Sequence, residues 1–254
     1  MKALFFCARE AFDVAQTDTE RAEVMNFEGD CLMALQRYEE ALSIYNNSLT
    51  QFKNTCQREE EPDLKEHVAK AFSQKMETLS KLERQAEIPP IYDEMICRFG
   101  ADNTPFIRKY LAKALLAKAS YFVQLAEREK SLSDYALALY DELIQKFDNE
   151  TDKEIKEIKQ KVAKAMFGKG SCLGNLIRYD DALKANDELI EKFGNETDTK
   201  IKQYVARAMY RRILNLRNIG RKEDAKKARD ELIEKFGNET DEEIQETLKD
   251  SKKK

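Results

Sequence analysis

The only histidine of the chain, His67, is the first residue to consider for acid–base or metal chemistry. Such chemistry needs a nucleophile with a base, a pair of carboxylates in a pocket, or a cluster of metal ligands. His67 lies in the sequence KEHVAKAF at the start of an expected helix and has no second ligand at a suitable spacing. We interpret it as a helix-start or surface residue, and we expect neither a metal site nor a cofactor.

Glycines and carboxylates offer no catalytic arrangement either. Gly168, Gly170 and Gly174 fall inside a helical pattern, so they indicate close helix packing rather than a phosphate-binding loop. Acidic pairs such as Asp180-Asp181 stand at the start of expected helices, where the positive end of the helix dipole stabilises their negative charge. The sequence therefore predicts a protein that is not an enzyme.

The cysteines and the N-terminus indicate the compartment. The five cysteines are scattered and form no C-x-x-C pair, which favours a reducing environment over disulfides or zinc. The apolar run at the start is too short for an export signal, and no segment is long enough to span a bilayer. We therefore expect a cytoplasmic protein. Its net charge of −4 gives no general attraction to nucleic acid or acidic membranes.

A short sequence motif is repeated along the chain and indicates how the chain is organised. DELIEKFGNETD occurs at residues 187–198 and again at 230–241, and DELIQKFDNETD occurs at 141–152. Two looser copies precede them, so that one phenylalanine marks each of five units: Phe52, Phe99, Phe147, Phe193 and Phe236. The intervals of 47, 48, 46 and 43 residues indicate a repeat protein, in which we expect these aromatic side chains to be core between neighbouring repeats.

Strong helix formers dominate the composition, and glycine and proline are few, so we expect an all-α chain. The expected order is an N-terminal capping helix in 1–18, five helix pairs in 19–240, and a capping helix with a Lys-rich tail in 241–254. The five pairs are expected at 19–53, 62–100, 104–148, 151–194 and 197–237, and the longest acidic stretch, 54–63, is expected to form a loop.

The ends of the expected helices carry recognisable signals. Gly194 and Gly237 fall just after a helix, where we expect a left-handed residue that glycine adopts without steric cost. Asp148 replaces this glycine in the third unit. Thr151-x-x-Glu154 and Thr240-x-x-Glu243 match the capping-box pattern. The sequence FGNETD therefore predicts a helix stop followed at once by a helix start.

Residues 163–194, AKAMFGKGSCLGNLIRYDDALKANDELIEKFG, resemble a tetratricopeptide repeat. In that family a small residue in the first helix (helix A) and an alanine early in the second (helix B) let the two helices approach closely. Gly170 and Ala182 match these positions, and Gly29 and Ala41 match them in the first unit. The resemblance covers about residues 20–236. It implies a right-handed α-solenoid of antiparallel helix pairs, with a longer period than the family's usual repeat of about 34 residues.

The resemblance also implies where a partner would bind, because helix A lines the concave surface that usually holds a peptide in this family. The family pattern places a cation at one equivalent point of four successive helices: Lys70, Lys113, Lys164 and Arg207. Four more candidates follow on the same helical face: Tyr210, Arg211, Asn175 and Asn218. We expect a basic, amide-lined groove that binds an acidic segment or a C-terminal carboxylate. The alternative is that the lysines only extend into water.

The leading interpretation is a non-enzymatic scaffold that binds a peptide or partner protein on the concave helix-A face. One alternative is a regulatory or assembly module cut from a longer protein, whose uncapped ends could self-associate. Another is single-stranded RNA binding, which needs basic residues interleaved with stacking aromatic side chains. Only Phe167, Tyr210 and Tyr121 stand near enough for that purpose.

Overall fold

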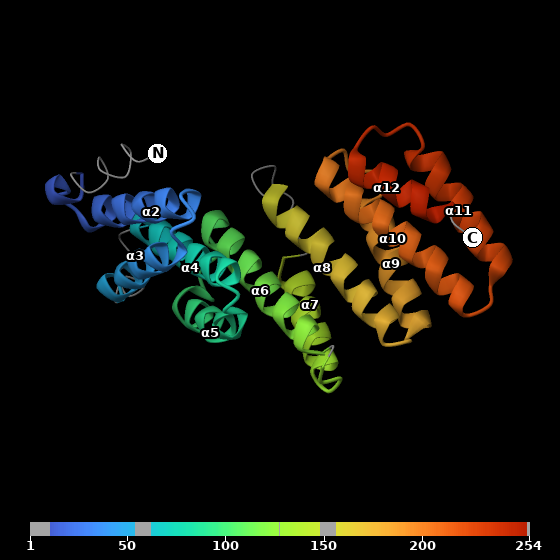
Figure 1. The fold of residues 1–254 in the computed structure, drawn as a ribbon, viewed down its shortest axis with the longest axis horizontal. Helices are drawn as coiled ribbons and strands as arrows, with labels where there is room; N and C mark the ends of the chain where they lie inside the picture. The colour runs from blue at the N-terminus through green and yellow to red at the C-terminus, as the bar shows by residue number, and fades with distance from the viewer. Residues whose placement is uncertain (1–10, 54–61, 127, 148–155, 253–254) are drawn as a thin grey trace. The chain divides into compact units, whose positions relative to one another are not determined.

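The computed structural model describes residues 11–53, 62–126, 128–147 and 156–252, and every regular element in these ranges is a helix (Figure 1). The elements are α2 (Asp18–Ala34), α3 (Tyr38–Gln51), α4 (Pro62–Lys81), the short 3₁₀ helix η2 (Gln85–Glu87), α5 (Ile88–Phe99), α6 (Pro105–Ala126), α7 (Leu132–Phe147), α8 (Lys156–Asn175), α9 (Tyr179–Phe193), α10 (Thr199–Asn218), α11 (Lys222–Phe236) and α12 (Glu242–Ser251). This architecture confirms the predicted all-α fold class. None of these helices combines the length and the apolar character that crossing a bilayer requires.

The chain divides into two compact units, residues 1–121 and 122–254. In the first unit, α2 pairs with α3, and α4 packs against both of them and against α5. A capping box starts α2, because Thr17 Oγ1 accepts the Glu20 N–H while the Glu20 carboxylate accepts the Thr17 N–H. The predicted division into five repeats stays a prediction.

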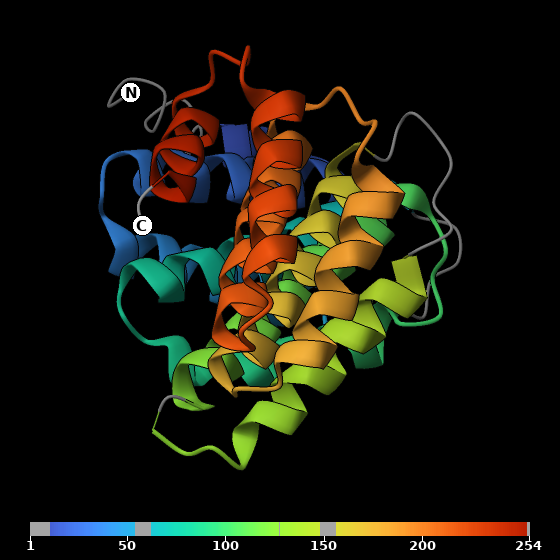
Figure 2. The same ribbon diagram turned by 90° about the vertical axis from the view of Figure 1, so that its right-hand side faces the viewer.

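In the second unit, each helix from α7 to α11 packs against the next one in the chain. The alternate helices α8, α10 and α12 also contact one another in order, so they form one row of helix-A type. Figure 2 shows α12, the red helix beside the C label, at the end of this unit. It contacts both α10 and α11, as a further helix A would. The unit is therefore a stack of antiparallel helix pairs.

Two predictions about the interior are confirmed. The five marker phenylalanines are all buried. The glycines of helix A also bring the helices of a pair together: a Cβ atom on Gly29 would lie 2.4 Å from the Tyr45 ring, and one on Gly170 would lie 2.5 Å from Asn186 Oδ1. Only glycine fits such an approach, because real Cβ atoms keep a larger distance from their neighbours.

The predicted left-handed conformation of Gly194 and Gly237 is wrong. Both residues have right-handed backbones, with φ of −59° and −58°. Glycine is needed there for another reason, since a Cβ would lie about 2.5 Å from the carbonyl oxygen of the residue four positions earlier. The left-handed residues among those described lie instead in the turn between helix A and helix B, where the chain reverses direction: Gln36, Glu83, Ile177 and Gly220.

The expectations for the last helix also need correction. Asp241, rather than Thr240, is the N-cap of α12, because its carboxylate accepts the Ile244 N–H at 3.1 Å. Ser251 is fully buried in the last turn of α12, so it belongs to the helix and not to the predicted Lys-rich tail. The Thr151–Glu154 box and Asp148 lie outside the described residues, as do residues 1–10 of the predicted capping helix and 54–61 of the predicted loop.

Candidate functional site

Two of the predicted binding lysines take part in ion pairs within the first unit. Lys70 Nζ lies 2.8 Å from Asp30 Oδ2, and Lys113 Nζ lies 2.9 Å from Glu77 Oε2. Each pair joins a helix A to the helix A of the preceding pair. Asp30 also accepts the Tyr45 hydroxyl at 2.9 Å and Gln74 Nε2 at 2.7 Å. The fold itself therefore neutralises these two cations.

The two predicted cations of the second unit differ. Lys164 on α8 and Arg207 on α10 are exposed and make no ion pair with a residue that the structure describes. The sequence explains this, because Ser120 and Ser171 stand at the positions that correspond to Asp30 and Glu77. The Arg207 guanidinium lies over the Phe167 ring, 4.5 Å from its centroid, in a cation–π contact.

Arg211 is held in place by the preceding helix A. Its Nε donates to Ser171 Oγ at 3.4 Å, and its Nη2 donates to Asn175 Oδ1 at 3.0 Å. Burial lowers the pKa of Arg211 below its ordinary value, and the nearby Arg207 charge adds to this effect. Arg207 precedes Arg211 by one turn of α10, so a carboxylate near both guanidinium groups would be stabilised by both charges.

These arginines open onto a hollow of about 700 Å³ between α8, α10 and α12. It is lined by Phe167 and Ser171 of α8, by Arg207, Tyr210, Arg211 and Leu214 of α10, and by Glu243, Glu246, Thr247 and Asp250 of α12. Three predicted residues, Arg207, Tyr210 and Arg211, thus come together. Lys164, Asn175 and the exposed Asn218 are not among the lining residues.

Sequence reasoning missed the carboxylates of α12. Glu243 and Glu246 line the hollow but make no ion pair with Arg207 or Arg211. The hollow therefore has a cationic wall on α10 and an anionic wall on α12. The repeat period could have indicated an acidic wall, because Asp250 follows Arg207 by the same interval as Arg207 follows Lys164. A carboxylate therefore stands on α12 at the position that Lys164 and Arg207 occupy on their helices.

The repeated DELI sequence has a structural role that the sequence alone did not show. Its aspartate on one helix B, or that of the looser copy DEMI at 93–96, forms an ion pair with a cation on the next helix A: Lys118 with Asp93 at 2.7 Å, Lys169 with Asp141 at 2.7 Å, and Arg212 with Asp187 at 3.2 Å. The cation follows the aspartate at a nearly constant spacing, and this was the available signal. We call this series the aspartate ladder.

The NETD sequence joins neighbouring helix pairs in a similar way. Asp198 is the N-cap of α10, where it accepts the Ile201 N–H at 3.1 Å, and it also accepts Gln160 Nε2 of α8 at 3.1 Å. Asp241 accepts Gln203 Nε2 of α10 in the same geometry. Partial burial acts to raise the pKa of Asp198, but bonds from Lys156 and the Ile201 N–H outweigh it and lower that pKa.

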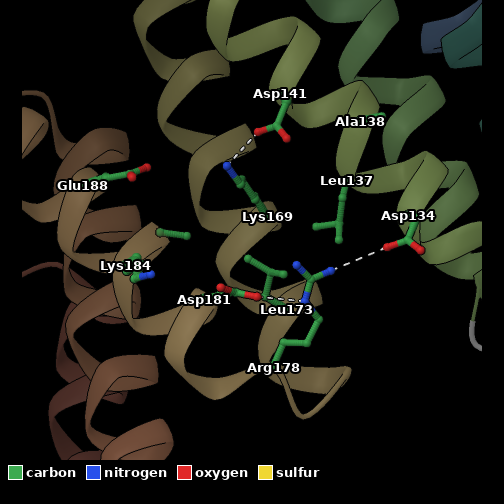
Figure 3. A pocket seen from close by; sticks show the side chains of 11 residues that line it. Asp134, Leu137, Ala138, Asp141, Lys169, Leu173, Arg178, Asp181, Lys184 and Glu188 are labelled. Atoms are coloured by element: carbon green, nitrogen blue, oxygen red, sulfur yellow. Dashed lines mark hydrogen bonds and ion pairs between the residues drawn. The ribbon is translucent and has the colours of Figure 1, made fainter.

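A second hollow of about 400 Å³ lies between α7, α8 and α9 (Figure 3). Leu137 and Ala138 of α7, Leu173 of α8 and Ala185 of α9 give it apolar sides. Its charged residues are Asp134, Asp141, Lys169, Arg178, Asp181, Lys184 and Glu188. Lys169 points to Asp141, and Arg178 lies between Asp134 and Asp181, at 3.5 and 2.9 Å. We call this hollow the outer groove.

Among the residues that the structure describes, the remaining sequence candidates form no reactive cluster. His67 is half-buried, and its carbonyl accepts Asn26 Nδ2 at 2.9 Å. In the part of the chain that the structure describes, no group of His, Cys, Asp and Glu side chains is arranged to hold a metal ion. Cys31 and Cys172 are buried, and burial raises the pKa of both thiols, which makes the thiolate form less accessible.

The chain matches no protein-family model, and no curated protein matches its sequence. Among solved structures, BtubC (BKLC) from P. vanneervenii is similar over 93% of this chain and 91% of that chain, with a TM-score of 0.63 and 14% identity. A thermophilic TPR protein of Thermus thermophilus matches over 91% and 98%, with a TM-score of 0.43 and 16% identity. The TPR2AB domain of yeast Sti1, in complex with pHSP90, matches over 98% and 91%, with a TM-score of 0.32 and 15% identity.

Proposed function

We propose that this chain, whose fold is a helix-pair repeat of the tetratricopeptide kind, is a scaffold that binds a segment of a partner protein on its helix-A face. The observation that carries the proposal is the hollow between α8, α10 and α12, in which Arg207, Tyr210 and Arg211 come together. Rigid stacked helices hold these side chains in place before binding, which reduces the entropy lost when a segment docks.

The two arginines define what the segment should carry. Arg207 is fixed over Phe167 and Arg211 is fixed by Ser171 and Asn175, so both guanidinium groups are positioned for a carboxylate. Glu243 and Glu246 on the opposite wall would repel a segment that is acidic throughout. We therefore propose a segment that directs a carboxylate toward α10 and a neutral or basic side chain toward α12.

Nucleic-acid binding finds less support than protein binding. Phe167, the most suitable stacking residue, is covered by the Arg207 guanidinium and lies 6.1 Å from the Tyr204 ring. Its face is therefore occupied, whereas a single-strand binder offers aromatic faces to the bases.

Charge reversal at exposed cations tests the proposal. Lys164→Glu with Arg207→Glu removes two cations that make no ion pair with described residues, so we expect the melting temperature to change little. Capture from extract, quantified by mass spectrometry, should show partner proteins that this variant loses. Lys222→Glu with Lys226→Glu on the exposed face of α11 is the matched control, because it changes the net charge by the same amount.

The result expected is a set of proteins retained by the unaltered chain and by the α11 control but not by the variant of the helix-A face. Equal retention by all three proteins would contradict binding at this face. Retention that disappears after nuclease treatment would contradict the scaffold proposal and favour the RNA alternative.

A further inference from the structure

One repeat later, between α9, α10 and α11, the residues that correspond to Lys169 and Glu188 form a different set of ion pairs, and we call this place the sister groove. In the sister groove, Arg212 of α10 bridges both walls: Nε lies 3.2 Å from Asp187 Oδ1 of α9, and Nη1 lies 3.0 Å from Glu231 Oε2 of α11. In the outer groove, Lys169 takes the place of Arg212 and forms an ion pair with Asp141 of α7.

Glu188 is therefore a carboxylate of the outer groove that Lys169 does not bind. It corresponds to Glu231 in the repeat, and it lines the α9 wall of the groove. Glu188 makes no ion pair with a residue in the described part of the chain. Figure 3 shows Lys169 directed at Asp141, with Glu188 on the other side of the groove.

The difference follows from the chemistry of the two cations. A guanidinium has five N–H donors in a rigid fork and can bond two carboxylates at once, whereas an ammonium is a compact point charge at the end of a flexible stem. Arg212 can therefore close its groove by joining the two walls. Lys169 reaches one wall only, and the groove stays open with a volume of about 400 Å³.

The space beside Glu188 suits the side chain of an arginine. Ala138 and Ala185 are small, and Leu137 and Leu173 give apolar surface on which the methylene stem of an arginine could lie. The Arg178 guanidinium is already held by Asp134 and Asp181, so it does not compete for Glu188. Lys184, one turn before Glu188 on α9, makes no ion pair with it.

We propose that the outer groove binds an arginine side chain of a partner protein, with its guanidinium on Glu188 and beside Asp141. The sister groove shows that a guanidinium can bond the corresponding carboxylates, because there the chain's own Arg212 forms ion pairs with Asp187 and Glu231. This site lies on the helix-B side and uses none of the residues of the helix-A hollow. It therefore goes beyond the proposed function, and either proposal can fail without the other.

Two exchanges between the grooves test this directly. Lys169→Arg should let the chain bridge its own two walls, which closes the outer groove and raises the melting temperature. Arg212→Lys should open the sister groove and lower the melting temperature. Glu188→Gln removes the carboxylate at an exposed position and should leave the fold intact.

The probe is Nα-acetyl-L-arginine methylamide, titrated into the ¹⁵N-labelled chain and followed by NMR, with the corresponding lysine derivative as the control. We expect saturable shifts at Ala138, Leu173 and Ala185 with the arginine probe, and weaker binding of the lysine probe. Glu188→Gln and Lys169→Arg should each abolish these shifts, and Arg212→Lys should add a second set near Ala228. Absence of saturable shifts with the folded chain would overturn the proposal, and so would unchanged binding to folded Glu188→Gln or Lys169→Arg.

Discussion

Ile177 shows how a single residue can work against the fold around it. This residue occupies the left-handed turn between α8 and α9 with φ of 64°, although its side chain is β-branched and the residue is 73% exposed. Gly220 stands at the same position in the next repeat with φ of 79°. For a residue with a Cβ, the left-handed conformation costs about 1–2 kcal/mol.

Replacing Ile177 with glycine is therefore expected to stabilise the chain. Because little buried surface is lost, the relief of strain should exceed the added entropy of the unfolded chain, for a net gain of about 0.5–1 kcal/mol. The midpoint of urea unfolding should rise with an unchanged slope. Gly220→Ile is the reciprocal control and should destabilise by a similar or larger amount, and equal midpoints for all three proteins would contradict this account of the turn.

Lys75 shows what happens where the aspartate ladder lacks a member. It stands on α4 at the position of Lys118 and Lys169, but Asn46 replaces the aspartate on the preceding helix B. Burial lowers the pKa of Lys75 below its ordinary value of 10.5. The folded state therefore binds this proton less strongly than the unfolded state, and stability associated with Lys75 should increase as the pH rises toward 10.5.

Asn46→Asp should complete the ladder and stabilise the chain at neutral pH by about 0.5–1 kcal/mol, the upper range for partly exposed ion pairs. The pH dependence that Lys75 causes in the alkaline range should shrink as well. Urea unfolding between neutral and alkaline pH, compared with the double variant Asn46→Asp, Lys75→Met, measures both effects. If the single and double variants gain the same stability, then the ion pair is not the cause.

At the scale of the elements, Asp198 joins two helix pairs through one carboxylate. It caps α10, accepts Gln160 of α8 and forms an ion pair with Lys156 at 2.8 Å. Its folded-state pKa is lowered from the ordinary 3.8, so the stability it contributes is present above that pH and is lost as the pH falls through the folded-state value.

Asp198→Asn keeps an oxygen for the cap but removes the charge. We expect a loss of about 1 kcal/mol at neutral pH, from the ion pair and the charge-assisted bonds. The difference from the unaltered chain should vanish at acidic pH, where both side chains are neutral. Urea midpoints from neutral to acidic pH would show this convergence, and a difference that persists in acid would point to the amide geometry instead.

The elements themselves were largely predictable from the sequence, and the reasons are local. Pro62 and Pro105 mark helix starts, the repeated phenylalanines mark helix ends, and Gly29 and Gly170 mark close approaches. Contacts between repeats were not predictable in the same way, since a pair such as Arg212 and Asp187 depends on the register between two helices. The backbone of Gly194 was also predicted wrongly. A glycine just after a helix can provide a left-handed backbone, but it can also stand where a Cβ atom would lie too close to a carbonyl oxygen, and the sequence does not distinguish the two cases.

At the scale of the whole molecule, the sequence allowed only part of the candidate site to be predicted. The helix-A rows identified Arg207, Tyr210 and Arg211, but they did not distinguish these residues from Lys70 and Lys113, which form ion pairs within the fold. That distinction depends on the residue opposite each cation on the preceding helix. The exposed residues of α12 are charged, among them Glu242, Glu246 and Lys249, and the self-association expected of uncapped ends stays a prediction.

We propose above that a partner protein docks in the hollow between α8, α10 and α12. The most direct measurement places the photo-crosslinker p-benzoylphenylalanine at Tyr210 inside the hollow, and at Lys226 on the exposed face of α11 as the control. After irradiation in cell extract, we expect a covalent protein adduct from position 210 that is absent from position 226 and lost with Lys164→Glu and Arg207→Glu. Adducts from position 226 alone, or from both positions with the same protein, would contradict it.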